Sequence, residues 1–267
     1  MEGLGVEGVV VRFGGLIALD GVSVAAPPGR ITGLIGPNGA GKTTMFNVCC
    51  GFQPASAGTV LWDGIDITKD SPAHRARRGI GRTFQRMELF GSMTVRENVA
   101  YAIESLHVGD SPLTQLGLVG GGRAVRSEIN DRTGELLELC HLTDVADAVA
   151  GEISTGHGRL VELARALARR PRILLLDEPS SGLDVKESAM FGDLLVKLVA
   201  EQNLGILMIE HDMTLVLRIC DWIEVLDFGK PLTSGTADEI RHSQVVRDAY
   251  LGKQDREIAA LEATSNI

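Results

Sequence analysis

Short runs of apolar and β-branched residues recur along the chain, and turn residues separate most of them. These runs predict β-strands at 8–13, 21–26, 30–35, 57–64, 172–178 and 205–211. The last two runs, RILLLDE and GILMIEH, stay apolar through their middle with no alternation. That pattern is typical of strands in a parallel sheet that is covered on both faces.

Other stretches repeat apolar positions at helical spacing. They predict helices at 42–51, 93–106, 126–142 and 158–170. Gly51 ends the first of these helices, and Thr94 with Glu97 has the pattern of a capping box at the second. A stretch rich in Gly, Leu and Ser, from about 106 to 122, is expected to be a loop. Strands that alternate with helices indicate an α/β fold with a mostly helical insert.

The composition is that of an ordinary globular protein. The chain has 267 residues, of which 44 % are apolar and 23 % are charged, so it can bury a sizeable core. Its formal net charge is -9, which argues against a general nucleic-acid binder because such proteins usually carry a basic excess. We therefore expect no nucleic-acid partner.

The cysteines and the apolar runs bear on compartment. Cys49, Cys50, Cys140 and Cys220 show no C-x-x-C or metal-binding spacing, which favours core packing in a reducing compartment. No signal-peptide pattern opens the sequence, and no apolar run approaches the roughly 20 residues that span a bilayer. We expect a chain with no transmembrane segment.

The stretch GPNGAGKT at 36–43 fits the phosphate-binding pattern G-x-x-x-x-G-K-[ST], after a predicted strand and at the start of a predicted helix. Glycines let backbone N–H groups surround phosphate oxygens, and the helix N-terminus adds partial positive charge. Lys42 would reach the β- and γ-phosphates of a bound nucleotide, and the Thr43 hydroxyl would bind Mg²⁺. A glycine-rich turn with a surface lysine is the plainer alternative. The predicted ATP-binding residues here are Gly36, Pro37, Asn38, Gly39, Ala40, Gly41, Lys42, Thr43 and Thr44.

Two carboxylates end the apolar strand ILLLDE at 173–178. Asp177 would face the phosphates and hold Mg²⁺, and Glu178 would orient and polarise the attacking water. The alternative is a solvated acidic pair at a strand end. About 33 residues later His211 also follows a buried strand, so its ring could approach the γ-phosphate, although a lone histidine there is usually structural. Gln85 ends the strand-like GIGRTFQ, where its amide could sense the metal and the water.

These elements occur in one order along the chain: phosphate loop, glutamine, a variant signature, Asp-Glu strand end, SSGLD and histidine. That order resembles the nucleotide-binding subunit of ATP-binding-cassette (ABC) transporters. The resemblance implies a P-loop NTPase cassette over 1–252, with a RecA-like core sheet, an antiparallel β subdomain and a helical subdomain inserted at about 87–160. It leaves 253–267 as a polar C-terminal tail.

The same resemblance implies roles for single residues. It makes Glu178 the catalytic base, His211 the switch histidine and Gln85 the Q-loop glutamine. The residues implied to bind the metal are Thr43, Gln85 and Asp177. Phe13 falls where the family places an aromatic ring against adenine, and it could equally be a core residue. The residues implied for the D-loop are Ser181, Gly182, Leu183 and Asp184.

Finer features, such as RFGGLIALDGVS, LFGSMTVRENV and GTADEIR followed by AYLG, resemble the branched-chain amino acid uptake ATPases of bacteria and archaea. The ATPases of urea and amide importers share many of these sequence features. The resemblance implies a peripheral ATPase on the cytoplasmic face of the inner (plasma) membrane. Its partners would be integral-membrane permease subunits, a second ATPase subunit, identical or different, and indirectly an external solute-binding protein.

The stretch ISTGH at 153–157 departs from the family's usual signature, L-S-G-G-Q. In the family this segment caps the γ-phosphate held by the opposite subunit, through the serine hydroxyl, backbone N–H groups and a helix N-terminus. A β-branched residue at 155 would be strained if the backbone there required a positive φ. If the position required only room, threonine would fit. The residues implied for the signature are Ser154, Thr155, Gly156 and His157.

The function expected from these observations is that of an ATPase that powers an ABC importer, with branched-chain amino acids as cargo. A urea, amide or other solute transporter is the alternative within the same class. The variant signature also motivates a different class, a nucleotide-gated binding module that does not hydrolyse ATP, and the presence of Glu178 argues against that class.

Overall fold

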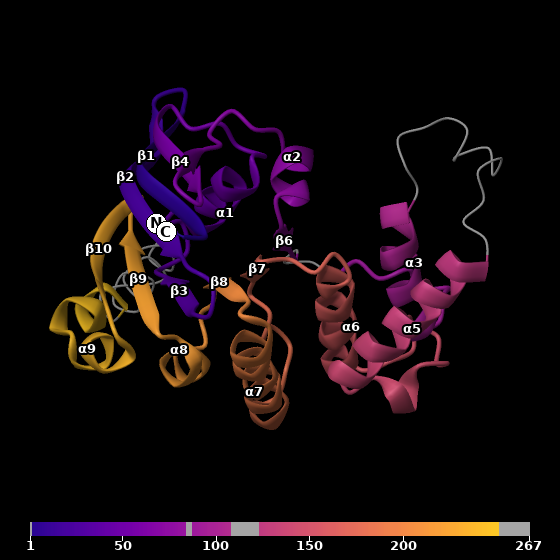
Figure 1. Cartoon of the computed structure of the whole chain (residues 1–267). Helices are drawn as coiled ribbons and strands as arrows, with labels where there is room; N and C mark the ends of the chain where they lie inside the picture. Colours follow the sequence, from indigo (N-terminus) through magenta and orange to yellow (C-terminus); the bar gives the residue numbers. More distant parts are fainter. Residues whose placement is uncertain (1, 84–86, 108–122, 251–267) are drawn as a thin grey trace, which may run out of the picture.

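The computed structural model describes residues 2–83, 87–107 and 123–250, which form two sheets and a set of helices (Figure 1). The first sheet is antiparallel, with the strand order β2-β1-β4-β5. Its strands are β1 (Leu4–Phe13), β2 (Leu16–Ala26), β4 (Ala57–Trp62) and β5 (Ile65–Asp66). β1 and β2 pair from Leu4 opposite Ala26 to Phe13 opposite Leu16. This pairing explains why both strands begin earlier than the apolar runs predict.

The second sheet has the strand order β10-β9-β3-β8-β7-β6. Its strands are β3 (Ile31–Ile35), β6 (Ile80–Arg82), β7 (Ile173–Asp177), β8 (Gly205–Ile209), β9 (Trp222–Asp227) and β10 (Lys230–Gly235). All neighbouring pairs are parallel except β9 with β10. Every residue of β7 and β8 is buried, as their apolar runs predict, and every residue of β3 is buried as well. The carboxyl ends of these strands meet at one edge of the sheet, where ligands bind in open α/β folds.

The helices cover this sheet and form a group at its side (Figure 1). They are α1 (Lys42–Cys50), α2 (Pro72–Arg77), α3 (Val95–His107), α5 (Arg123–Leu139), α6 (Thr155–Leu167), α7 (Val185–Gln202), α8 (Met213–Ile219) and α9 (Ala237–His242), with a 3₁₀ turn at Thr143–Val145. α6 begins earlier than predicted because the Ser154 hydroxyl accepts a hydrogen bond from the His157 N–H at 3.2 Å. It ends before Arg170, whose φ of 49° is left-handed.

The predicted capping box at the start of α3 is confirmed. The Thr94 N–H donates to Glu97 Oε2 at 2.8 Å, and the Glu97 N–H donates to Thr94 Oγ1 at 3.1 Å. Among the described helices, none is both long and apolar enough to cross a membrane.

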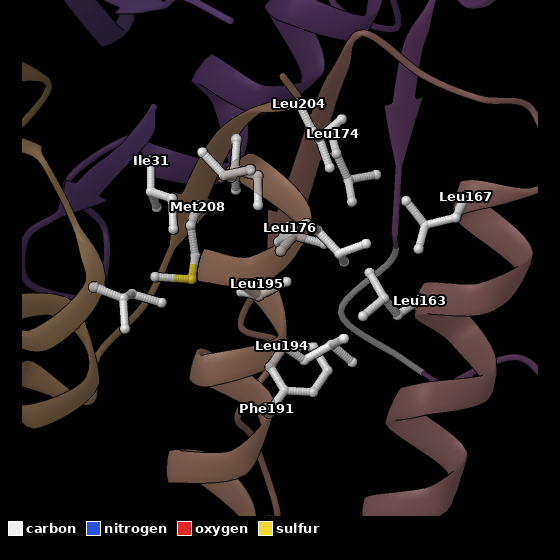
Figure 2. Packing of buried hydrophobic residues seen from close by; sticks show 14 of the residues in the cluster. Ile31, Leu163, Leu167, Leu174, Leu176, Phe191, Leu194, Leu195, Leu204 and Met208 are labelled. Carbon is white, nitrogen blue, oxygen red and sulfur yellow. The ribbon is translucent and has the colours of Figure 1, made fainter. Parts of the chain in front are cut away.

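One apolar cluster joins the core sheet to α6 and α7 (Figure 2). Leu163 and Leu167 of α6 lie in it with Leu174 and Leu176 of β7. Each of these four side chains is at most 2 % exposed, so their burial contributes roughly 2 kcal/mol apiece. A second cluster joins α1 to the antiparallel sheet and to Leu175 and Leu207 of the core sheet. α1 and α6 therefore both pack on the core sheet, and both begin at predicted site residues.

Candidate active site

The glycine-rich stretch after β3 forms a loop that leads into α1. Gly36 has a φ of 150°, and a Cβ there would stand 2.1 Å from the carbonyl oxygen of Leu226. Gly41, at the start of α1, has a φ of 96°. Lys42 Nζ donates to the carbonyl oxygens of Gly36 and Pro37 at 2.6 and 3.0 Å. The loop therefore curls around the ammonium group of its own lysine, which is the geometry of a phosphate cradle.

This loop opens into a cavity of about 660 Å³. The residues that line the cavity are Phe13, Leu16, Ile17, Ala18, Asn38, Gly39, Ala40, Gly41, Lys42, Thr43, Thr44, Glu178, Phe228 and Gly229. Apolar residues of β1 and β2 form one side, and the polar loop with Glu178 forms another. A cavity with one apolar and one phosphate-binding side suits a nucleotide.

The two predicted carboxylates differ in environment. Asp177 is the last residue of β7 and is 2 % exposed. Burial raises the pKa of Asp177, and the guanidinium of Arg82, whose Nη2 lies 3.2 Å from Asp177 Oδ2, acts against that shift. Glu178 has a φ of 50° and donates its N–H to the carbonyl oxygen of Ile209 at 2.9 Å. Left-handed backbone at a non-glycine residue is typical of functional sites, and here it accompanies a carboxylate that lines the cavity.

His211 follows β8 at the same edge of the sheet. Its side chain is 63 % exposed, and its Nδ1 lies 3.8 Å from Glu210 Oε2. Glu210 itself is fully buried. Its carboxylate accepts hydrogen bonds from the N–H groups of Ser180 at 2.8 Å, His211 at 3.1 Å and Asp212 at 3.4 Å. Glu210 therefore ties the loop after β7 to the loop that carries His211.

The variant signature forms the start of α6. Ser154 caps the helix, and its hydroxyl also lies 3.1 Å from His157 Nδ1. Thr155 is the first helical residue and is not among the described residues with positive φ. The hypothesis that the Thr155 backbone is strained is therefore wrong. A threonine at this position needs only space for its side chain. A Cβ on Gly156 would stand 2.5 Å from Glu187 Oε1, so a larger residue there would require the Glu187 side chain to move.

The predicted D-loop connects β7 to α7 and touches the signature helix. Asp184 caps α7 in a capping box with Glu187. The Ser181 carbonyl oxygen accepts a hydrogen bond from Arg159 Nε at 3.3 Å. Among the residues that line the 660 Å³ cavity there is none from the signature or the D-loop. The structure thus brings these two segments together, and neither contributes a residue to the cavity of the chain's own phosphate loop.

Comparison with known proteins identifies this arrangement. The sequence profile described as "ABC transporter" matches residues 19–181. The chain belongs to the ABC transporter family. It is 41 % identical over 251 residues to the high-affinity branched-chain amino acid transport ATP-binding protein BraF of Pseudomonas aeruginosa, covering 94 % of this chain and 98 % of BraF. It is 40 % identical over 256 residues to LivG of Escherichia coli, which bears the same description, with the same shares covered.

Solved structures of the ABC family agree. A cassette in its ADP conformation superposes with a TM-score of 0.81 at 33 % identity, covering 94 % of this chain and 99 % of that one. A dimeric cassette in a post-hydrolysis state, bound to ADP and Pi, superposes with a TM-score of 0.72 at 26 % identity, covering 88 % and 98 %. The predicted fold class, family resemblance and ATPase class are confirmed.

Three more residues complete the comparison between the predicted site and the structure. Phe13 is 48 % exposed and lines the cavity, so the core alternative is wrong for it. Gln85 lies outside the described residues. Glu210 was not predicted, although a carboxylate directly after an apolar strand and before His-Asp was a signal for it.

Thr43 and Asp177 supply the kinds of donor that the predicted magnesium ion would need. Thr43 supplies a hydroxyl from the start of α1, and Asp177 supplies a buried carboxylate from the end of β7, at the same edge of the sheet. Hard oxygen donors of this kind are the ligands that Mg²⁺ takes beside phosphates. Within the described ranges there is no group of three or more His, Cys, Asp or Glu that could hold a metal by itself, so the phosphates and water would have to complete its coordination.

Proposed function

We propose that this chain is the ATP-hydrolysing subunit of an importer for branched-chain amino acids. One observation carries the proposal above all: Glu178 lines the same cavity as the phosphate loop, on a backbone held by its hydrogen bond to Ile209. A non-hydrolysing binding module would have no use for that carboxylate. BraF and LivG, which match this chain over nearly their whole lengths, are named for branched-chain amino acids, and this supports the cargo.

In this proposal the phosphates of ATP lie in the loop around Lys42. The Lys42 ammonium exchanges its two carbonyl contacts for phosphate oxygens, and the backbone N–H groups of the loop and of α1 stabilise the negative charge. Mg²⁺, held by Thr43 and Asp177, would add positive charge at the same phosphates. The adenine base lies toward Phe13.

Hydrolysis then depends on two strand ends. Glu178 orients and polarises the attacking water, and His211 donates a hydrogen bond to the γ-phosphate. The exposure of His211 leaves its ring free to meet the nucleotide, while Glu210 fixes its backbone. Buried Glu210 acts through His211 and Ser180, so it is a positioning residue.

The signature acts on a second copy of the cassette or on a different ATPase chain. Ser154, the N–H groups at the start of α6 and His157 form a cap that does not face the chain's own cavity. A head-to-tail dimer would place this cap over the γ-phosphate of the partner. The dimeric cassette among the structural neighbours supports this arrangement.

Contact with the permease is proposed at a groove of about 270 Å³ between α2, β6 and α6. Arg165 of α6, Arg169 just after α6, Glu88, Arg75 and Phe52 are among the residues that line this groove. Within the proposed cassette of 1–252, Glu88 belongs to the helical part inserted at about 87–160 and the other residues lie outside that part. A permease segment bound in the groove would therefore contact both parts. The chain would then sit peripherally on the cytoplasmic face of the inner membrane.

Uptake by cells tests the cargo. A strain that carries Glu178→Gln at the native locus is given labelled leucine, and labelled urea in parallel. We expect leucine uptake to fall to background while urea uptake is unchanged. Loss of urea uptake with normal leucine uptake would contradict the proposed cargo and favour the urea and amide branch.

A further inference from the structure

The two-residue turn between β9 and β10 has a bulky residue where turn chemistry favours a small or polar one. Asp227 pairs with Lys230, so Phe228 and Gly229 form the turn. Their φ values are 44° and 76°. Both lie in the left-handed region, where glycine, asparagine and aspartate are favoured and a bulky side chain is an outlier.

A second hairpin of this fold shows what the turn would ordinarily use. Trp62 pairs with Ile65, and the two residues between them, Asp63 and Gly64, have φ values of 50° and 78°. Asp63 is a residue that this turn favours, and its carboxylate also accepts the Gly3 N–H at 2.9 Å. The same conformation is thus met by aspartate at one hairpin and by phenylalanine at the other.

Burial does not explain the phenylalanine. Phe228 is 72 % exposed, against 48 % for Phe13. Both residues line the 660 Å³ cavity together with the phosphate loop. An exposed ring on a strained backbone gains nothing in the folded chain alone, so the gain must come from something that the ring contacts.

The turn is fixed to the phosphate loop. The Gly229 N–H donates to the carbonyl oxygen of Ala40 at 3.2 Å, and the Asp20 N–H donates to the carbonyl oxygen of Gly229 at 2.8 Å. The position of Phe228 at the rim of the cavity is therefore set by the same backbone that binds phosphate.

We propose that Phe228 is a second aromatic contact for the base of the bound nucleotide, in addition to Phe13. Aromatic rings bind the faces and edges of purines, and this contact depends on the base and not on the phosphates. The inference rests on the proposed nucleotide site and adds to it a residue that reads the base.

The test compares Phe228→Asn with the wild-type chain, because asparagine relieves the turn while removing the ring. Equilibrium binding is measured for MgATP and for magnesium tripolyphosphate, which lacks the base, and the midpoint of thermal unfolding is measured without ligand. We expect ATP affinity to fall about ten-fold and tripolyphosphate affinity to stay within about two-fold. We also expect the unfolding midpoint to be no lower than that of the wild type.

Two control variants separate an effect on the base contact from an effect on the turn. Asp63→Asn, at the matched turn away from the cavity, should leave both affinities unchanged, and Phe13→Ala should lower ATP affinity alone. Unchanged ATP affinity in Phe228→Asn would overturn the inference, and so would an equal loss for ATP and tripolyphosphate. Loss of ATP-induced dimerisation with unchanged ATP affinity would also overturn it and would assign the ring to the subunit interface. If the wild-type chain bound no ATP at all, the proposed function itself would fail.

Discussion

The methyl group of Thr155 lies against Gly182. A Cβ built on Gly182 would stand 3.1 Å from Thr155 Cγ2, and Gly182 has a φ of 83°. The residue that makes the predicted signature unusual therefore packs, within one chain, on the predicted D-loop that follows β7. Its departure from glycine is a packing feature between these two segments, on an ordinary helical backbone.

Replacing Thr155 by glycine, the residue of the usual signature, should therefore bring little gain. We expect Thr155→Gly to change the steady-state rate of ATP hydrolysis by less than about two-fold and to lower the free energy of unfolding by up to about 1 kcal/mol, because glycine weakens the first turn of α6. A hydrolysis assay and urea unfolding measure the two effects. A ten-fold faster variant would show that Thr155 hinders the site.

Replacing Glu210 tests whether this residue positions the loops that carry Ser180 and His211. Glu210→Gln puts an amide NH₂ group among three backbone N–H donors, so the free energy of unfolding should fall by about 1–3 kcal/mol. Since Glu210 is not among the residues that line the cavity, we expect kcat to fall at least ten-fold while the affinity for ATP changes little.

Glu224→Gln is the control for Glu210→Gln. Glu224 is a partly buried carboxylate on β9 whose Oε1 accepts a hydrogen bond from Trp222 Nε1 at 2.9 Å. Glutamine keeps an oxygen that can accept from Trp222, and burial already disfavours the charge of Glu224. This replacement should therefore leave both stability and kcat nearly unchanged. If Glu210→Gln lost stability without losing kcat, Glu210 would be a structural residue only.

The sequence was sufficient for the elements whose signals are local. Fully apolar runs predicted β7 and β8, and the glycine pattern predicted the loop around Lys42, because burial on both faces and phosphate binding each impose their own residue types. It could not predict that the Glu210 carboxylate binds the N–H group of Ser180, which lies 30 residues away in the sequence. Nor could it show that Phe228 lines the same cavity as the phosphate loop, because the two segments are far apart along the chain. Nor could the sequence decide whether Thr155 has a strained backbone or an ordinary backbone with space for its side chain. The answer depended on where α6 begins.

The raised pKa of the buried Asp177 should make the free energy of unfolding depend on pH. Burial raises its pKa above the unfolded value of 3.8, so the folded state holds the proton more tightly than the unfolded state. The free energy of unfolding must then fall as the pH rises from 3.8 through the folded pKa. Asp177→Asn lacks this titration. We expect the stability of the wild type relative to Asp177→Asn, measured by urea unfolding, to decrease over this range. An increase would mean that the ion pair with Arg82 outweighs burial.

We expect this chain to hydrolyse ATP with its ISTGH signature. Steady-state ATP hydrolysis by the purified chain is measured beside Glu178→Gln, and dimerisation is followed by light scattering. The wild type should turn over ATP, the variant should lose about 100-fold or more of that rate, and the variant should form an ATP-dependent dimer. Wild-type turnover in Glu178→Gln would show that Glu178 is not the catalytic base. No turnover by the wild type at concentrations where ATP binds would show that this signature does not support hydrolysis.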